Sequence, residues 1–324
     1  MLKYIYISKY APAHPQAQKA ELYKMAEIST VLKEFNNICT CFAGYPLAKH
    51  STFKIGGAAE YCAFPKTTGE LCALIEAAKA HGVRARVFGG ASNVLFSSEG
   101  VSGLVILTTE MKGLALENGC LRALAGTRLS ELCNFAARES LCGAEFLFGI
   151  PGTVGGAVYM NAGAHGGEVS HILVESICYD EEKAGIVTLS AEEHDFGYRE
   201  SALKHRPLTV LSSLFKLDAG EREEIEAKMK ALTEKRRASQ PLEMPSAGSV
   251  FKRPAVGFAG KYIEDAGLKG ARIGGAEISR KHAGFIVNAG GATSSDVLAL
   301  AEKAKAEVLS RFGVELESEI IYVE

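Results

Sequence analysis

The chain has 324 residues, of which 47% are hydrophobic and 23% are charged, and its formal net charge is -2. This composition is typical of a globular protein with a sizeable core, and the lack of a basic excess argues against nucleic-acid binding. No apolar run reaches the roughly 18 residues that a membrane helix needs, and the first residues are too polar for a secretory signal. We therefore expect a cytoplasmic protein with no membrane partner.

The cysteines are scattered and form no C-x-x-C pair, so the sequence indicates neither a zinc site nor a disulfide framework. They stand at positions 39, 41, 62, 72, 120, 133, 142 and 178. We expect reduced, partly buried thiols in a reducing compartment, and no bound metal.

Residues 1–50 are predicted to be a partly helical appendage, with a helix from about Gln16 to Asn37 and a possible natural start at Met25. Residues 51–110 alternate strands with a helix, as an α/β unit does. Its helix begins after the capping residue Thr67 and ends at Gly82. Its strands are predicted over residues 60–64, 83–88 and 103–107.

Residues 111–218 form a second predicted α/β unit, with a helix near 129–140 and strands near 173–179 and 209–217. Residues 219–324 form the third. This last unit begins with a charged amphipathic helix over 221–238 and ends with a helix over 295–312 and an alternating strand over 314–323. In that strand Glu315, Glu317 and Glu319 would share one face.

The strand over 83–88 runs into a first glycine loop. Its candidate ligand-binding residues are Gly89, Gly90, Ala91, Ser92 and Asn93. Glycines let backbone amides approach a ligand closely, and successive amides form a nest for anions. A simple tight turn is the alternative.

A second glycine loop has seven glycines between residues 149 and 167. Glycine adds little to a packed core and costs backbone entropy, so a flat phosphate-bearing ligand along the backbone explains the density better than a series of turns. The candidate residues are Gly149, Ile150, Pro151, Gly152, Thr153, Gly155, Gly156 and Asn161. Neither loop fits the G-x-G-x-x-G or P-loop pattern, which excludes those two nucleotide sites.

Together the two loops resemble the FAD domain of vanillyl-alcohol-oxidase-type (PCMH-type) flavoproteins. Longer motifs narrow the resemblance to the UDP-N-acetylenolpyruvoylglucosamine reductase (MurB) family, over residues 45–324. They lie at residues 51–57, 89–95, 149–157, 198–201, 245–252, 282–288 and 316–320. The implied fold is α+β: an FAD-binding domain of two α/β subdomains, 51–110 and 111–218, and a C-terminal α+β substrate-binding domain, 219–324.

The chain departs from the family pattern at three positions. Ala91 stands where a third glycine is usual, Ser51 replaces Asn, and Ser318 replaces Pro. Only 50 residues separate Arg199 from Ser249, and this short spacing resembles that of the shorter form of the family. That form lacks an inserted loop with a substrate-contacting tyrosine, so what closes over the nucleotide here is open.

The resemblance implies reduction of the enolpyruvyl group on UDP-N-acetylglucosamine by NADPH through non-covalent FAD, in a protein that we expect to be a monomer. Such chemistry needs a cation for a carboxylate, a proton donor and polar stabilisation of an enolate-like state. By resemblance these are Arg199, Ser249 and Glu319. The residues alone favour non-catalytic roles: a surface ion pair for Arg199, a turn or cap for Ser249, and a solvated acidic face for Glu319.

Tyr198 and Lys252 are further candidates for contact with the nucleotide-sugar substrate. Two alternatives are an oxidase or dehydrogenase of the same fold that acts on an alcohol or amine, and a non-catalytic nucleotide-binding or regulatory protein that has lost its flavin. The motifs around Ser249 and Glu319 favour the reductase over both.

Overall fold

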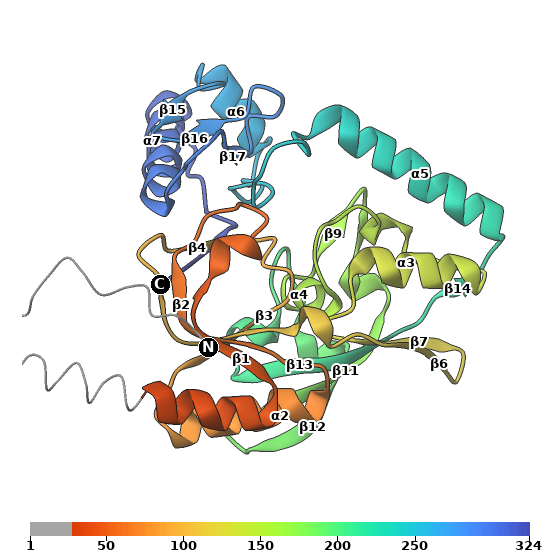
Figure 1. Ribbon diagram of the computed structural model, residues 1–324. Coiled ribbons are helices and arrows are strands. Elements are labelled where there is room, and N and C mark those ends of the chain that lie inside the picture. Colours follow the sequence, from red (N-terminus) through yellow and green to blue (C-terminus); the bar gives the residue numbers. More distant parts are fainter. Residues whose placement is uncertain (1–27) are drawn as a thin grey trace, which may run out of the picture.

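A four-stranded sheet and two helices form the first unit of the chain, for which the computed structural model describes residues 28–324. In spatial order the strands are β1 (Thr40–Pro46), β2 (Ala58–Phe64), β5 (Val101–Leu107) and β3 (Ala85–Phe88). A helix over 28–38 and α2 (Thr68–Ala80) lie together beneath this sheet (Figure 1). The predicted strands and helix of this unit are thus confirmed, and Thr67 accepts the Glu70 amide as the cap of α2.

The predicted helix over 16–37 is confirmed only from residue 28 onwards. Residues 16–27, which include the predicted start at Met25, lie outside the described residues. Phe35 of this helix is fully buried, and its ring meets that of Tyr61 on β2 at 5.5 Å. Strand β1 precedes residue 51 and yet pairs antiparallel with β2. The first sheet therefore begins before the predicted limit of the first subdomain.

The second unit is a five-stranded antiparallel sheet that shares its core with the first unit. Its strands, in spatial order, are β12 (Gly185–Ser190), β11 (Leu173–Asp180), β13 (Leu208–Phe215), β7 (Cys120–Leu124) and β6 (Leu114–Glu117). Helices α3 (Leu129–Arg138) and α4 (Val154–Tyr159) belong to this unit. The predicted helix and both predicted strands are confirmed.

Short elements complete the first two units. They are β4 (Val94–Phe96), β8 (Leu141–Cys142), β9 (Gly163–Ala164), β10 (Gly167–Glu168), β14 (Asp218–Ala219), and 3-10 turns at 47–49, 108–110, 145–147, 169–171, 192–194 and 202–204.

The third unit lies above the first in Figure 1, and its core also includes Phe53, Ile55 and Leu95 of the first unit. It contains α6 (Ala259–Asp265), α7 (Ser294–Phe312), and a small sheet of β15 (Arg272–Ile273), β16 (Ala276–Ile278) and β17 (Ile286–Asn288). Thr293 caps α7, and Gly313 ends it at φ +65, so the predicted helix over 295–312 is confirmed.

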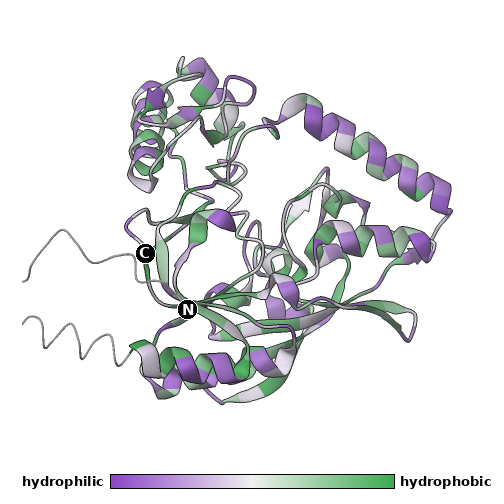
Figure 2. Ribbon diagram, in the orientation of Figure 1, coloured by the Kyte–Doolittle hydropathy of each residue, from purple (hydrophilic) through white to green (hydrophobic). Residues whose placement is uncertain are grey.

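Helix α5 (Arg222–Ser239) leads into the third unit and spans the upper right of Figure 1. It is hydrophilic along most of its length (Figure 2), which matches the predicted charged helix. Ile225 and Met229 are buried in the core of the first two units, so this helix is amphipathic as expected.

The predicted strand over 314–323 is wrong for most of its length. Only β18 (Ile321–Val323) is a strand, and it pairs in parallel with β4. The residues just before it pair with a different segment of the chain. Ser318 forms a single bridge with Phe251, and the Glu319 amide donates to the Val250 carbonyl at 2.7 Å. Of the three glutamates, Glu315 and Glu317 are exposed, whereas the Glu319 side chain is largely buried.

Within residues 28–324, no helix is both long and apolar enough to cross a lipid bilayer.

Candidate active site

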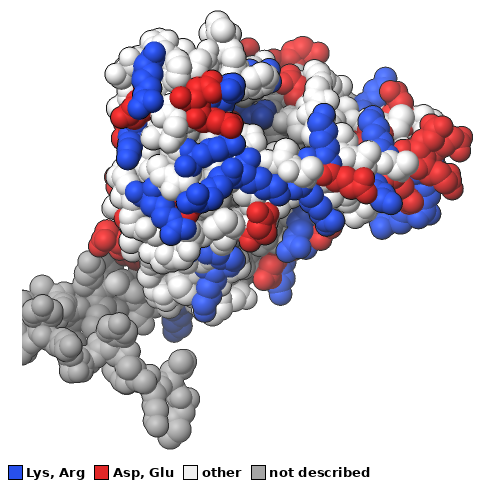
Figure 3. All heavy atoms as spheres, turned by 90° about the horizontal axis from the view of Figure 1, so that it is seen from above, with Lys and Arg blue, Asp and Glu red and all other residues white. Residues whose placement is uncertain are grey.

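One cavity of about 1150 Å³ receives residues from all three units. Both glycine loops line it, together with Arg199, Ser249 and Glu319. Seen from above, Lys and Arg side chains gather in a band across this side of the molecule (Figure 3). The size of the cavity and the cations among its lining residues suit a large anionic ligand.

The first glycine loop begins where β3 ends and presents free amides. In the described part of the chain, no amide of residues 90–93 donates a hydrogen bond to another group. Ala91 has a φ of +47, a left-handed conformation that a glycine would adopt without strain. A run of unpaired amides with one left-handed residue is the geometry of an anion nest.

The second loop packs directly on the first. A Cβ added to Gly89 would overlap Thr153 Oγ1, and one added to Gly90 would lie 3.8 Å from the Gly152 Cα. Ser92 Oγ donates to the Pro151 carbonyl at 2.6 Å. The Thr153 hydroxyl is buried and has no partner within the described residues, so it is available to a ligand held between the loops.

Most of the predicted cofactor residues line the cavity. These are Gly89, Gly90, Ala91, Ser92, Asn93, Ile150, Pro151, Gly152, Thr153, Gly155 and Gly156. Gly149 and Asn161 do not. The Asn161 side chain is buried and structural: its Nδ2 donates to the Gly197 carbonyl at 2.9 Å, and its Oδ1 accepts the Ser170 amide at 3.0 Å.

Arg199 and Glu319 meet in the cavity although 120 residues separate them. Arg199 Nε donates to Glu319 Oε1 at 2.8 Å, and its Nη2 donates to the Gly163 carbonyl at 3.0 Å. Only 20% of the Arg199 side chain and 14% of the Glu319 side chain are exposed. Burial raises the pKa of the Glu319 carboxyl, although the charge of Arg199 acts to lower it.

Backbone contacts bring Ser249 and Glu319 to the same wall. Ser249 pairs with Phe285, and the next residue, Val250, accepts the Glu319 amide at 2.7 Å. Asn93 Nδ2 donates to the Glu319 carbonyl at 3.0 Å, which ties this wall to the first glycine loop. The structure therefore assembles all three predicted catalytic residues around one cavity.

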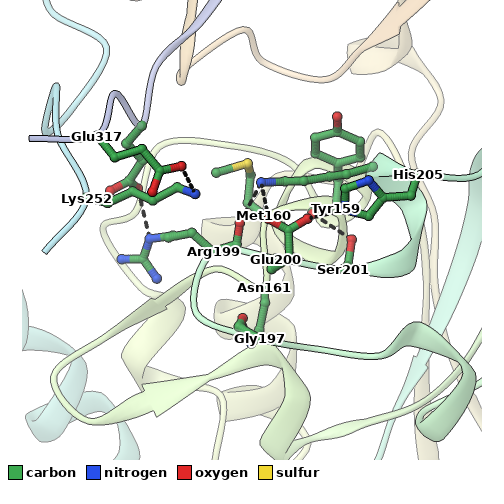
Figure 4. A network of polar contacts seen from close by, with 12 residues as sticks. Tyr159, Met160, Asn161, Gly197, Arg199, Glu200, Ser201, His205, Lys252 and Glu317 are labelled. Carbon is green, nitrogen blue, oxygen red and sulfur yellow. Dashed lines mark hydrogen bonds and ion pairs between the residues drawn. The ribbon is translucent and has the colours of Figure 1, made fainter. Parts of the chain in front are cut away.

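The two predicted substrate residues are placed differently. Tyr198 lines the cavity, is half exposed, and its hydroxyl accepts the Arg253 amide at 3.2 Å. Lys252 does not line the cavity; its Nζ donates to Glu317 Oε1 at 2.6 Å, as Figure 4 shows.

Several cavity residues gave no signal in the sequence. Arg236 and Gln240, at the end of α5, line the cavity with a buried Nε and a buried Oε1 that have no partner in the described chain. Burial lowers the pKa of Arg236. On a charged helix they look like solvated residues, so only the placement of α5 reveals them. Arg253, whose guanidinium lies 4.4 Å above the Phe258 ring, also lines the cavity.

No group of three or more His, Cys, Asp or Glu side chains in residues 28–324 is arranged to hold a metal ion.

Comparison with known families first gives the class of protein. The family described as "FAD binding domain" matches residues 59–181, which hold both glycine loops. The cofactor of this fold and site is therefore FAD, and the chain is a flavoprotein.

A second family, "UDP-N-acetylenolpyruvoylglucosamine reductase, C-terminal domain", matches residues 240–323. The reductase of that name from Caldicellulosiruptor bescii is 45% identical over 281 residues, which are 86% of this chain and 89% of that protein. The one from Streptococcus pneumoniae is 45% identical over 276 residues, 85% of this chain and 91% of that protein.

The crystal structure of this reductase from Thermus caldophilus is 35% identical, with a TM-score of 0.75, and the match covers 88% of this chain and 99% of that one. The chain belongs to the UDP-N-acetylenolpyruvoylglucosamine reductase family. The resemblance and the α+β fold with its PCMH-type FAD-binding domain are confirmed.

Proposed function

We propose that this chain reduces UDP-N-acetyl-3-O-(1-carboxyvinyl)-glucosamine to UDP-N-acetylmuramate with NADPH, in the synthesis of peptidoglycan precursors. The observation that carries this proposal is the meeting of Arg199, Glu319 and the Ser249 segment on one wall of the cavity that the glycine loops also enter. The names of the relatives support the same substrate.

The first glycine loop would hold FAD through its unpaired amides, and the second through the Thr153 hydroxyl. Bound FAD, once reduced by NADPH, would supply the hydride for the terminal carbon of the enolpyruvyl double bond. We propose that it is bound non-covalently, since no histidine directly follows the first glycine loop. NADPH as the electron source, the monomeric state and the cytoplasmic location are further parts of the proposal.

Arg199 would bind the substrate carboxylate. Its Nε and Nη2 are held by Glu319 and the Gly163 carbonyl, while Nη1 has no hydrogen-bond partner in the described residues. A guanidinium keeps its charge and binds a carboxylate through directed hydrogen bonds. Negative charge that develops on the carboxylate as the double bond is reduced would therefore be stabilised in a partly buried site.

Ser249 would give its hydroxyl proton to the carbon next to the carboxylate. This proton and the hydride together saturate the double bond and leave the product carboxylate unchanged in charge. A serine hydroxyl is a weak acid, so it can protonate only a strongly basic carbon and must be reprotonated from its surroundings.

Glu319 would stabilise the enolate-like state or relay the proton. Because burial raises the pKa of its carboxyl, Glu319 takes up a proton more readily than an exposed glutamate does. A protonated carboxyl can donate a hydrogen bond to the developing negative charge, which an ionised one cannot.

The test is NADPH oxidation by flavin-loaded protein, with and without the enolpyruvyl UDP-sugar. We expect oxidation that depends on the sugar, and a loss of at least about 100-fold in Ser249→Ala, in line with removal of a general acid. FAD content should stay unchanged in this variant because Ser249 is not in the glycine loops. Flavin-loaded protein that oxidises NADPH at the same rate with and without the UDP-sugar would contradict the assigned substrate and favour an oxidase of the same fold.

A further inference from the structure

Arg199 stands at a position where the backbone favours glycine. Its φ is +57, and it follows Tyr198 in a tight turn closed by paired hydrogen bonds between Gly197 and Glu200, both 3.1 Å. Turns with a left-handed second central residue usually place Gly or Asn there. An arginine in this position keeps its conformation only if its surroundings hold it.

The surroundings hold the turn from two sides. The carbonyl of Gly197 accepts from the Asn161 side chain at 2.9 Å, and Ser201 Oγ donates to the Tyr159 carbonyl at 2.7 Å. Figure 4 shows these residues around Arg199. These bonds fix the two ends of the turn. They do not hold the peptide group between Arg199 and Glu200.

That peptide group is held at both of its polar atoms. Its N–H, on Glu200, donates to the Gly197 carbonyl, and its oxygen, on Arg199, accepts from Lys204 Nζ at 2.5 Å. A flip of this peptide would break both bonds and change the direction of the Arg199 backbone. Lys204 is therefore the group that holds its oxygen end.

The surroundings of Lys204 suit this task. Only 17% of its side chain is exposed; its Nζ lies 3.5 Å from Glu200 Oε2 and 5.8 Å from the centre of the Tyr159 ring. A charged donor makes a stronger hydrogen bond than a neutral one, the more so where water is partly excluded. Lys204 does not line the cavity, so it acts through Arg199 and does not touch the substrate.

We propose that Lys204 is a positioning residue for the reduction: its ammonium group holds the Arg199 carbonyl and so keeps the guanidinium directed at Glu319 and the substrate carboxylate. This inference rests on the proposed function for the substrate, and on the structure alone for the conformation of Arg199.

The test separates the two halves of the reaction in Lys204→Met. We expect reduction of bound FAD by NADPH to stay within about twofold of the wild-type rate, because it does not use the carboxylate site. The step with the enolpyruvyl substrate should lose about 10- to 100-fold in kcat/KM, mainly in kcat, as loss of a charge-assisted hydrogen bond implies. Lys204→Arg keeps a charged donor and should recover most of this loss.

Lys79→Met is the matched control. Lys79 Nζ also donates to a backbone carbonyl, that of Glu181 at 2.8 Å, but from an exposed place on α2. It should keep both rates. If Lys204→Met behaves like this control, or slows both halves equally, the proposal is wrong.

A crystal structure of Lys204→Met gives a readout that needs no substrate. We expect Arg199 to leave its left-handed conformation or lose its contact with Glu319, and an unchanged Arg199 would overturn the proposal. If Lys204→Met does not fold, Lys204→Gln takes its place with the same expectations. If the UDP-sugar does not increase NADPH oxidation by the wild-type protein, the proposed function is wrong. The crystal structure of Lys204→Met would still decide whether Lys204 holds Arg199.

Discussion

Single residues in the site serve backbone geometry and chemistry at once. Arg199 and Ala91 both have left-handed backbones without being glycines, at φ +57 and +47. A left-handed residue with a Cβ costs roughly 1–2 kcal/mol, so such positions persist where surrounding contacts fix them. At Arg199 the chemistry explains the side chain; for Ala91 in place of glycine the structure offers no reason.

Gly89 is the residue whose space is most limited by a neighbour in the site. We expect Gly89→Ala to lower the FAD content of the purified protein and to destabilise it by about 1–3 kcal/mol, because the added Cβ overlaps Thr153 Oγ1. The ratio of flavin to protein absorbance and unfolding in denaturant measure the two effects.

Two variants control this prediction. Thr153→Ala in the same chain removes the overlapped oxygen and should recover part of the stability of Gly89→Ala. Gly69→Ala in α2 adds a Cβ that meets nothing closer than Thr67 Oγ1 at 4.0 Å, and it should stabilise the helix by about 0.5–1 kcal/mol. Full flavin content in Gly89→Ala would mean that the loops do not hold the cofactor as described.

At the scale of elements, the sequence predicted segments with a regular period and failed where partners change along the chain. Helices α2 and α7 have side-chain caps, and α2, α5 and α7 all have buried apolar faces that define them locally. The segment over 314–323 also alternates, yet it passes from Val250 to Asn93 as hydrogen-bond partner within three residues. Alternation describes a strand with one continuous partner, which this segment lacks.

The segment that presents Arg199 also carries a pH-sensitive residue, His194. Both of its ring nitrogens are buried without a partner within the described residues, and the ring stacks on Phe196 at 4.9 Å. Burial, and then the charge of Arg206, lower the pKa of His194 to about 4. In the unfolded chain the His194 ring takes up a proton below about pH 6.5, whereas in the folded protein it does so only near pH 4. The contribution of neutral His194 to the free energy of unfolding is therefore complete above about pH 6.5 and is lost as the pH falls toward 4.

We expect the wild-type protein to lose about 2 kcal/mol of stability through His194 between pH 7 and pH 4.5. His194→Phe keeps the aromatic stack and removes the titrating group, so its loss over the same range should be smaller by that amount. Denaturant unfolding at both pH values measures the difference. Equal losses in the two proteins would show that His194 is not protonated on unfolding in this range.

At the scale of the whole molecule, the sequence predicted the parts of the site but not their assembly. The glycine loops and the motifs around Arg199, Ser249 and Glu319 could be found because each is a local pattern. The contacts of Asn93 with Glu319 and of α5 with the cavity join segments far apart in the chain. No local pattern encodes such contacts, so Arg236, Gln240 and Lys204 were missed.

The charge of the cavity is another property that appears only in the whole molecule. The chain carries a formal net charge of -2, yet cations outnumber acids around the cavity. The cations are Arg84, Arg86, Arg199, Arg236, Arg253, Lys261 and Lys281, and the acids are Glu181, Glu264, Glu319 and Glu324. Such a local excess attracts an anionic ligand despite the net charge, and salt screens the attraction.

We therefore expect the KM for the enolpyruvyl UDP-sugar to rise about three- to tenfold when KCl is increased from roughly 0.05 to 0.5 M, with kcat changed by less than about twofold. Steady-state kinetics at several KCl concentrations measure both. Arg84→Gln should weaken the salt dependence, whereas Lys183→Gln, an exposed lysine outside the cavity, should leave it unchanged. A KM that is independent of salt would mean that direct contacts, and not the field of the cavity, bring the substrate in.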